Sequence, residues 1–95
     1  MRYFETYQPK YALIKATDKG EAIKLYKQKY REDEGLEQCL EEVKYDYALA
    51  KYCIVSTNLQ KVTPAPEVVV THFNYGRQRI LLESDRTGYK LPSID

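Results

Sequence analysis

Residues 10–31, KYALIKATDKGEAIKLYKQKYR, contain a strand followed by a helix, and the rest of the chain can be interpreted around them. The segment KYALIKA is predicted to be a strand, in which successive side chains point to opposite faces. The alternation predicts one face made of Ala12, Ile14 and Ala16 and another made of Tyr11, Leu13 and Lys15.

A helix is expected directly after this strand. Asp18 is a good N-cap, and Glu21 lies three residues later, where a capping-box acid belongs. Tyrosines and cations interleave in KLYKQKYR, but a helical repeat separates them in space. Tyr26 and Tyr30 are predicted to lie at the core with their hydroxyls near water. The opposite face is cationic and consists of Lys24, Lys27 and Arg31.

On the N-terminal side, YFETY can add a second strand, with Pro9 as a break.

On the C-terminal side, residues 32–46 contain seven acidic residues and one lysine, and these seven are half of the acidic residues in the chain. Gly35 in REDEG is available as the left-handed cap that ends the first helix. Leu36, Cys39, Leu40 and Val43 have helical spacing and predict a short helix over 36–44. A strand through CLEEVKY is the alternative. The helix would expose Glu34, Glu37, Glu41 and Glu42.

Asp46 can cap a further helix, YALAKYCIVST, which is apolar on two sides. Tyr47 and Ile54 lie on its second side. They are either buried within the domain, which we favour, or part of a homodimer interface. The inward face is predicted to be Ala48, Leu49, Tyr52 and Val55.

The segment 67–84 allows two interpretations. EVVVTHF and RQRILLES are rich in strand-forming residues around the turn signal NYG, and we favour a β-hairpin. The alternative is a helix from Thr63 to Tyr75, with Val69, Val70 and Phe73 inward and Gly76 as its cap, followed by a strand. SDRTGYKLPSID is expected to be a turn and a tail.

Ninety-five residues suit one domain, expected over 1–95. Charged residues make up 31% and hydrophobic residues 43%, and no apolar run is long enough for a membrane span, so a cytoplasmic protein is expected. Cys39 and Cys53 are predicted to be reduced thiols. The expected fold class is α+β, with a small, mostly antiparallel sheet and two to three helices packed on one face.

We find no pattern that indicates catalysis. His72 is the only histidine, and no Cys/His spacing matches a metal site. The four glycines are scattered and form no phosphate-binding loop. We therefore predict no catalytic, metal or cofactor site, and a protein that is not an enzyme. A basic turn that could contact phosphate or a base contains Tyr75, Arg77 and Arg79.

The segment YALIKATDKGEAIKLYKQKY, together with DYALAK and RILLES, resembles small uncharacterised accessory proteins of phages and mobile elements of Gram-positive bacteria. The resemblance implies a protein that acts by binding, in some cases to host factors or immune proteins. Anti-CRISPR proteins are one such group.

Three functions are consistent with these features. The first is binding of a host or defence-system protein through the acidic face, as an anti-defence inhibitor would do. The second is nucleic-acid binding through the cationic helix face and the basic turn. The third is binding of a nucleotide or small molecule by tyrosines at a dimer interface.

Overall fold

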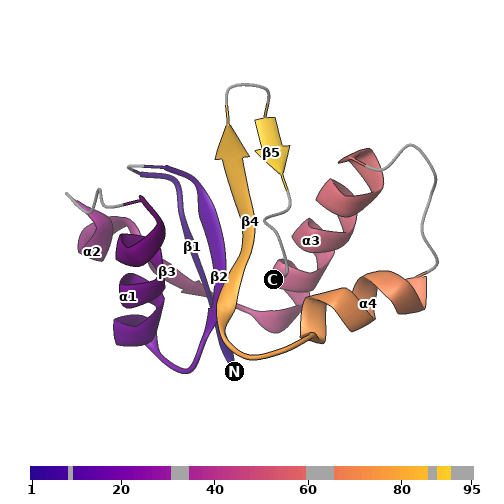
Figure 1. Cartoon of the computed structure of the whole chain (residues 1–95), viewed down its shortest axis with the longest axis horizontal. Helices are drawn as coiled ribbons and strands as arrows, with labels where there is room; N and C mark the ends of the chain where they lie inside the picture. Colours follow the sequence, from indigo (N-terminus) through magenta and orange to yellow (C-terminus); the bar gives the residue numbers. More distant parts are fainter. Residues whose placement is uncertain (9, 31–34, 60–65, 86–87, 91–95) are drawn as a thin grey trace.

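The chain forms one five-stranded sheet flanked by four helices, as shown by a computed structural model that describes residues 1–8, 10–30, 35–59, 66–85 and 88–90 (Figure 1). The strand order is β3-β1-β2-β4-β5, and every described pair is antiparallel. In chain order the elements are β1 (Arg2–Thr6), β2 (Ala12–Ala16), α1 (Lys19–Tyr30), α2 (Leu36–Cys39), β3 (Glu41–Val43), α3 (Tyr45–Leu59), α4 (Pro66–Asn74), β4 (Arg79–Asp85) and β5 (Gly88–Lys90).

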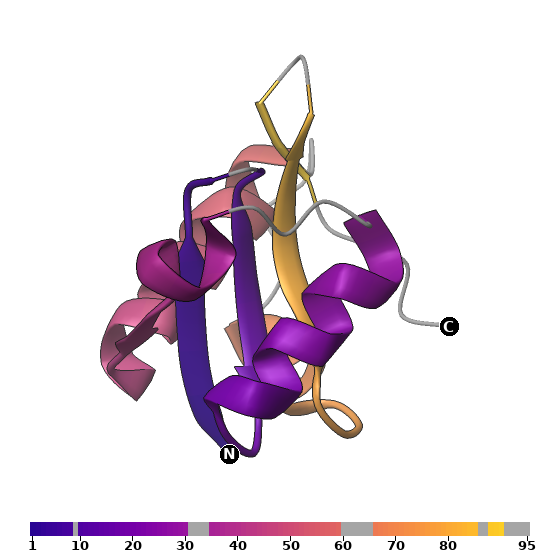
Figure 2. The same ribbon diagram turned by 90° about the vertical axis from the view of Figure 1, so that its left-hand side faces the viewer.

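The α+β class and the antiparallel sheet are confirmed, but the helices cover both faces of the sheet instead of one. Figure 2 shows α1 lying across one face, with α3 and α4 on the far side. The reason is the double-sided apolar pattern of β2: Ile14 packs toward α1, and Leu13 packs toward α3 and α4. A strand with two apolar faces needs a cover on each. No helix in the described part of the chain is long and apolar enough to cross a bilayer.

Helix α1 begins as predicted. The Asp18 carboxylate accepts a hydrogen bond from the Glu21 backbone N–H at 2.9 Å, which is the N-cap interaction. Tyr26 is fully buried and Tyr30 half-buried, so the inward tyrosine row is confirmed. Their hydroxyls do not point to water, however. Tyr26 donates to the Lys10 carbonyl at 3.0 Å, and Tyr30 donates to the Glu83 carboxylate at 2.7 Å.

The acidic segment combines both alternatives. Helix α2 is a single turn that ends at Cys39, and the chain then becomes strand β3, which pairs with β1. A longer helix over 36–44 is therefore wrong, because pairing with the edge of β1 competes with helix extension after Leu40. Gly35 has φ 76°, the left-handed conformation predicted for it as the cap of the first helix, but it stands at the N-cap position of α2.

Helix α3 begins at Tyr45, so Asp46 lies in its first turn instead of at the cap. Its predicted inward face is confirmed: Ala48, Tyr52 and Val55 are buried in the core, and Leu49 packs against them.

The hairpin expected over 67–84 is wrong in its first half, where α4 forms instead. Val69 and Phe73 are buried one helical turn apart, and Gly76, with φ 72°, follows the helix end. This apolar spacing outweighs the strand preference of β-branched residues, because propensity is a weak term beside tertiary burial. The second half is a strand, β4, and residues 88–90, expected to belong to the tail, pair with it as β5.

A β-bulge in β4 changes which side chains face each helix layer. The pairing with β2 shifts between Leu13, opposite Leu82, and Ile14, opposite Ile80, so Leu81 is the extra residue. Leu81 and Leu82 consequently both enter the core beneath α3 and α4. The next residue, Glu83, turns back toward α1, where it accepts from Tyr30.

Lys15 is the charged residue of β2, and it is only 2% exposed. Its ammonium donates to the backbone carbonyls of Phe73 at 3.3 Å, Tyr75 at 3.1 Å and Gly76 at 3.5 Å. Carbonyls at a helix C-terminus lack intrahelical donors and carry partial negative charge, so a cation there is favourable. Burial, and to a smaller degree Arg79, lowers the pKa of Lys15. This side chain fixes the end of α4 to the sheet.

We expect Lys15→Met to lower the free energy of unfolding by about 1–3 kcal/mol, because buried carbonyls would lose a charged donor. Lys24→Met, on the exposed face of α1, should change it by less than about 0.5 kcal/mol. Urea titration followed by circular dichroism measures both. Equal stability of the two variants would show that Lys15 does not hold α4.

Candidate functional site

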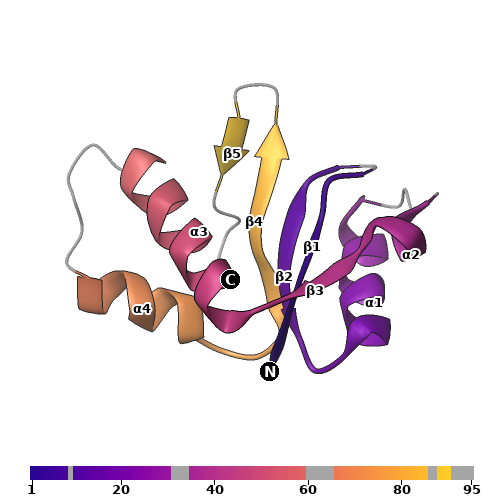
Figure 3. The ribbon, with the colours of Figure 1, turned by 180° about the vertical axis from the view of Figure 1, so that it is seen from behind.

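The predicted acidic surface lies at one edge of the sheet. Glu37 on α2 and Glu41 and Glu42 on β3 are all exposed, and we call these three residues the acidic edge. Figure 3 shows β3 running between α2 and α3 at this edge. Glu42 is partly neutralised, since Arg2 donates to its carboxylate from Nε at 3.1 Å and from a terminal nitrogen at 2.6 Å. Glu34 lies outside the described residues.

The predicted basic residues do not form one comparable surface. Lys24 forms an ion pair with Glu21 at 3.4 Å, and Lys27 is exposed on the same helix. Arg79 donates to the carbonyls of Tyr75 and His72, so it holds the end of α4. Arg31 lies outside the described residues. Tyr75 and Arg77 stay exposed in the segment between α4 and β4.

The two residues predicted for self-association have different surroundings. Ile54 is 61% exposed on α3, and the burial favoured from the sequence is wrong for it. Tyr47 is 43% exposed, but its hydroxyl points inward and donates to Glu5 at 2.7 Å. Tyr47 is therefore part of a polar cluster that the sequence did not predict.

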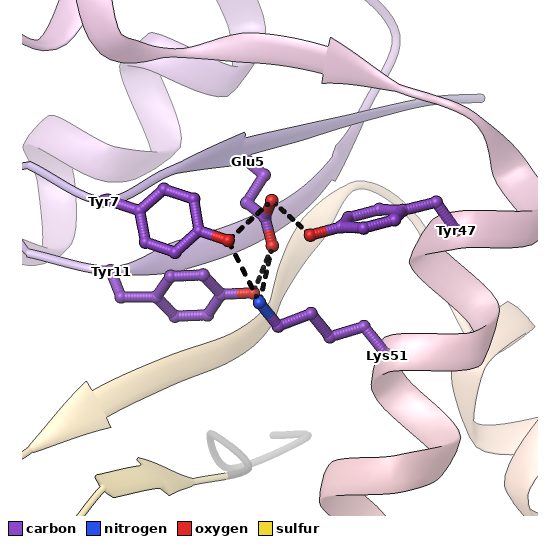
Figure 4. Close-up of polar contacts among 5 residues, drawn as sticks. All are labelled: Glu5, Tyr7, Tyr11, Tyr47 and Lys51. Carbon is purple, nitrogen blue, oxygen red and sulfur yellow. Dashed lines mark hydrogen bonds and ion pairs between the residues drawn. The ribbon is translucent and has the colours of Figure 1, made fainter.

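That cluster surrounds the carboxylate of Glu5, which lies between β1 and α3 (Figure 4). Glu5 is only 6% exposed. One carboxylate oxygen accepts from Tyr47 at 2.7 Å and from Tyr7 at 3.3 Å. The other accepts from Tyr11 at 2.7 Å and forms an ion pair with Lys51 at 3.1 Å. A buried carboxylate is tolerated when its lone pairs are satisfied in this way.

Lys51 occupies an aromatic cage within the cluster. Its ammonium lies 4.7 Å from the ring centroid of Tyr11, 5.2 Å from that of Tyr7 and 6.0 Å from that of Tyr47. It also donates to the Tyr7 hydroxyl at 3.2 Å. Ring faces are electron-rich and attract cations, so the cage and Glu5 act on Lys51 together.

The pKa values in the cluster follow from these contacts. Burial would raise the pKa of Glu5, but the hydrogen bonds from Tyr11 and Tyr47 and the charge of Lys51 outweigh it, so its pKa lies below the usual value. Burial and the hydrogen bond to Glu5 raise the pKa of Tyr11. Burial opposes the charge on Lys51, but its bonds to Tyr7 and Glu5 raise its pKa. All three groups therefore keep their ordinary charges at neutral pH.

Two surface grooves flank β3. The first, with a volume of about 360 Å³, lies between α2 and the end of β1 and is lined by Glu5, Tyr7, Gln8, Gln38, Cys39, Glu41 and Val43. The second, of about 470 Å³, lies at the other end of β3 and includes Arg2 and Lys44. The first groove adjoins the Glu5 cluster, because Glu5 and Tyr7 belong to both.

The sequence contained a weak signal for this cluster. Glu5 lies two residues after Tyr3 in β1, so both side chains point to the same buried face, where a carboxylate needs hydrogen-bond or ion-pair partners. Tyr47 and Lys51 lie one helical turn apart on α3 and so share one face of that helix. No rule of spacing connects Glu5 with residues 42 and 46 positions later. The hydroxyls of Tyr11, Tyr26, Tyr30 and Tyr47 form hydrogen bonds within the chain.

The described part of the chain contains no cluster of side chains suited to metal binding or to thiol chemistry. No group of three or more His, Cys, Asp or Glu side chains among those residues is arranged to hold a metal ion. Cys39 and Cys53 are free and half-buried, and burial raises the pKa of the Cys53 thiol. His72 is exposed.

One family model matches the chain: the YosH C-terminal domain, over residues 1–82. The matched range includes the strands β1 to β3, all four helices and most of β4. No curated protein and no solved structure matches.

We expect Glu5→Gln to lower the free energy of unfolding at pH 7 by about 2–3 kcal/mol, since Lys51 would lose its counter-charge. Because the pKa of Glu5 is lowered in the folded state, its stabilisation is present above the ordinary pKa of 4.5 and is lost as the pH falls through the lowered value. The variant should therefore lose less stability than the parent on acidification.

Urea titrations between neutral and acidic pH measure this difference, and Glu37→Gln, an exposed acid, is the matched control. If Glu5→Gln and the parent protein lost stability in parallel below neutral pH, Glu5 would not be the ionised centre of the cluster.

Proposed function

The chain belongs to the YosH C-terminal domain family, and on the basis of its fold and exposed charge we propose that it is a protein-binding module that contacts a basic surface of its partner through the acidic edge. The observation that carries the proposal is the exposure of Glu37, Glu41 and Glu42 on one edge of the sheet. Complementary charge of this kind increases association rates and selects partners.

The acidic edge is held by buried neighbours. Leu36 and Leu40 are buried beneath α1, and Glu37 and Glu41 each follow one of them directly in the chain. Burial of the two leucines therefore directs the following carboxylates outward. Because buried leucines already fix the backbone beside Glu37 and Glu41, this surface loses less conformational entropy on binding than a flexible segment would.

The resemblance to accessory proteins of phages and mobile elements supports a partner class. Within our proposal, the partner is a host or defence-system protein whose basic surface normally binds nucleic acid. The acidic edge would occupy that surface. The scattered basic residues support nucleic-acid binding less well, because Arg79 and Lys24 are engaged within the chain.

We expect the tagged protein to retain a partner from a bacterial lysate and to lose it when the acidic edge is neutralised. Glu37→Gln with Glu41→Gln should reduce the retained partner at least about tenfold, since two ionic contacts would be removed. Retention by the parent protein should weaken as salt is raised. Quantitative mass spectrometry of the eluted proteins measures both effects.

The matched control is Gln28→Lys with Asn74→Lys, which changes the net charge equally at two exposed positions away from the acidic edge. The control should retain the partner as the parent does. Equal retention by all three proteins would exclude the acidic edge as the contact surface. Recovery of nucleic acid by the parent, lost in a Lys24→Gln and Arg77→Gln variant, would support the basic alternative instead.

A further inference from the structure

We propose that the groove between α2 and the end of β1 binds an arginine side chain of the protein partner, stacked on Tyr7 and paired with Glu41. The inference rests on the proposed function and names the chemical group that the acidic edge recognises. Three observations support it: the size and lining of the groove, the carboxylates of Glu5 and Glu41, and the exposed Tyr7 at the groove wall.

The groove has the size and lining for one basic side chain. Its volume of about 360 Å³ exceeds that of a single guanidinium with its aliphatic stem. Its walls are a phenol ring, the carboxylates of Glu5 and Glu41, the amides of Gln8 and Gln38, and the half-buried Cys39 and Val43. Apolar walls would accommodate the stem of the side chain, and the polar groups would meet its charged end.

The charges of the groove favour a cation. Glu5 and Glu41 are directly opposite each other in the β1–β3 register, so their side chains project from the same face of the sheet. Lys51 neutralises Glu5. Among the described residues, Glu41 has no ion-pair or hydrogen-bond partner. A second cation in the groove would pair with Glu41.

Tyr7 supplies a surface for stacking. It is 59% exposed, although its hydroxyl accepts from Lys51 and donates to Glu5. The tilted contact with the Tyr11 ring, whose centroid lies 5.2 Å away, and the bonded hydroxyl hold the Tyr7 ring at the groove wall, while the residue as a whole stays exposed. The molecule already uses this arrangement once, because Lys51 lies over the tyrosine rings beside a carboxylate.

Arginine fits these groups better than lysine does. A planar guanidinium can stack on a phenol ring and form two parallel hydrogen bonds with one carboxylate. Its remaining N–H groups can donate to the amide oxygens of Gln8 and Gln38. A lysine ammonium is compact and strongly hydrated, and it can make only one of these contacts well at a time.

The test is a nuclear magnetic resonance titration of the whole chain with N-acetyl-arginine amide, up to about 100 mM at constant ionic strength, because one exposed ion pair with one stacking contact gives a dissociation constant on the order of tens of millimolar. We expect saturable shifts of the amide signals of Gln8, Gln38, Cys39 and Glu41. N-acetyl-lysine amide should bind at least about threefold more weakly, and the neutral isostere N-acetyl-citrulline amide should cause no saturable shift.

Variants distinguish arginine binding in the groove from nonspecific attraction to exposed carboxylates of the protein. Glu41→Gln should weaken arginine binding at least about fivefold, whereas Glu21→Gln, an equal charge change on α1, should leave it unchanged. Tyr7→Phe keeps the ring and should retain binding within about twofold, and Tyr7→Leu should weaken it. The dispersion of the amide spectrum shows whether each variant is folded. Equal binding of arginine and citrulline, or no effect of Glu41→Gln, would overturn the assignment.

The failure of this inference can be distinguished from failure of the proposed function. If neutralising the acidic edge abolished partner retention but arginine caused no localised shifts, the acidic edge would act without the groove. If arginine bound in the groove but no partner depended on the acidic edge, the pocket would remain and the partner proposal would fall.

Discussion

Among the sheet residues whose burial the structure describes, three carry buried charges, and the positions of the helices depend on how those charges are satisfied. Glu5 is 6%, Lys15 2% and Glu83 4% exposed. A charge removed from water costs several kilocalories per mole unless partners replace the lost hydration. Glu5 takes Tyr47 and Lys51 from α3 besides Tyr7 and Tyr11, Lys15 bonds to the end of α4, and Glu83 meets α1, where Lys29 lies at 2.5 Å and Tyr30 at 2.7 Å. One of these charges therefore ties each of α1, α3 and α4 to the sheet.

The bulge at Leu81 makes this arrangement compatible with a two-sided core. If the residues after Ile80 alternated regularly, with Leu81 paired instead of bulged, Glu83 would face α3 together with Glu5, and two carboxylates would lie in the same layer. With it, consecutive leucines enter one core and Glu83 faces the other helix layer. The helices α1, α3 and α4 cover the two faces of the sheet, and the short edge strand β3 keeps the carboxylates of Glu41 and Glu42 exposed.

The proposed recognition surface repeats the chemistry of the buried cluster. Inside the domain, a lysine lies among tyrosine rings and neutralises Glu5. At the surface, Glu41 projects beside Glu5 and the exposed ring of Tyr7, with space for one further cation. Because the inner lysine already balances Glu5, the outer carboxylate is available to a partner. Glu5 and Lys51 thus stabilise the fold, and the adjacent Glu41 and Tyr7 are the groups proposed to bind the partner.

The sequence by itself determined the local elements whose signals are carried by neighbouring residues. The two faces of β2, the Asp18 cap, the inward Tyr26 and Tyr30, the inner face of α3 and strand β4 are all confirmed. Only the tertiary structure decided that helices cover both sheet faces, that 66–74 is a helix, that α2 gives way to β3, and that Glu5 meets Tyr47 and Lys51. Those outcomes depend on pairing and burial between residues far apart in the chain, so local spacing left two alternatives open for 36–44 and for 67–84 and did not connect Glu5 with α3.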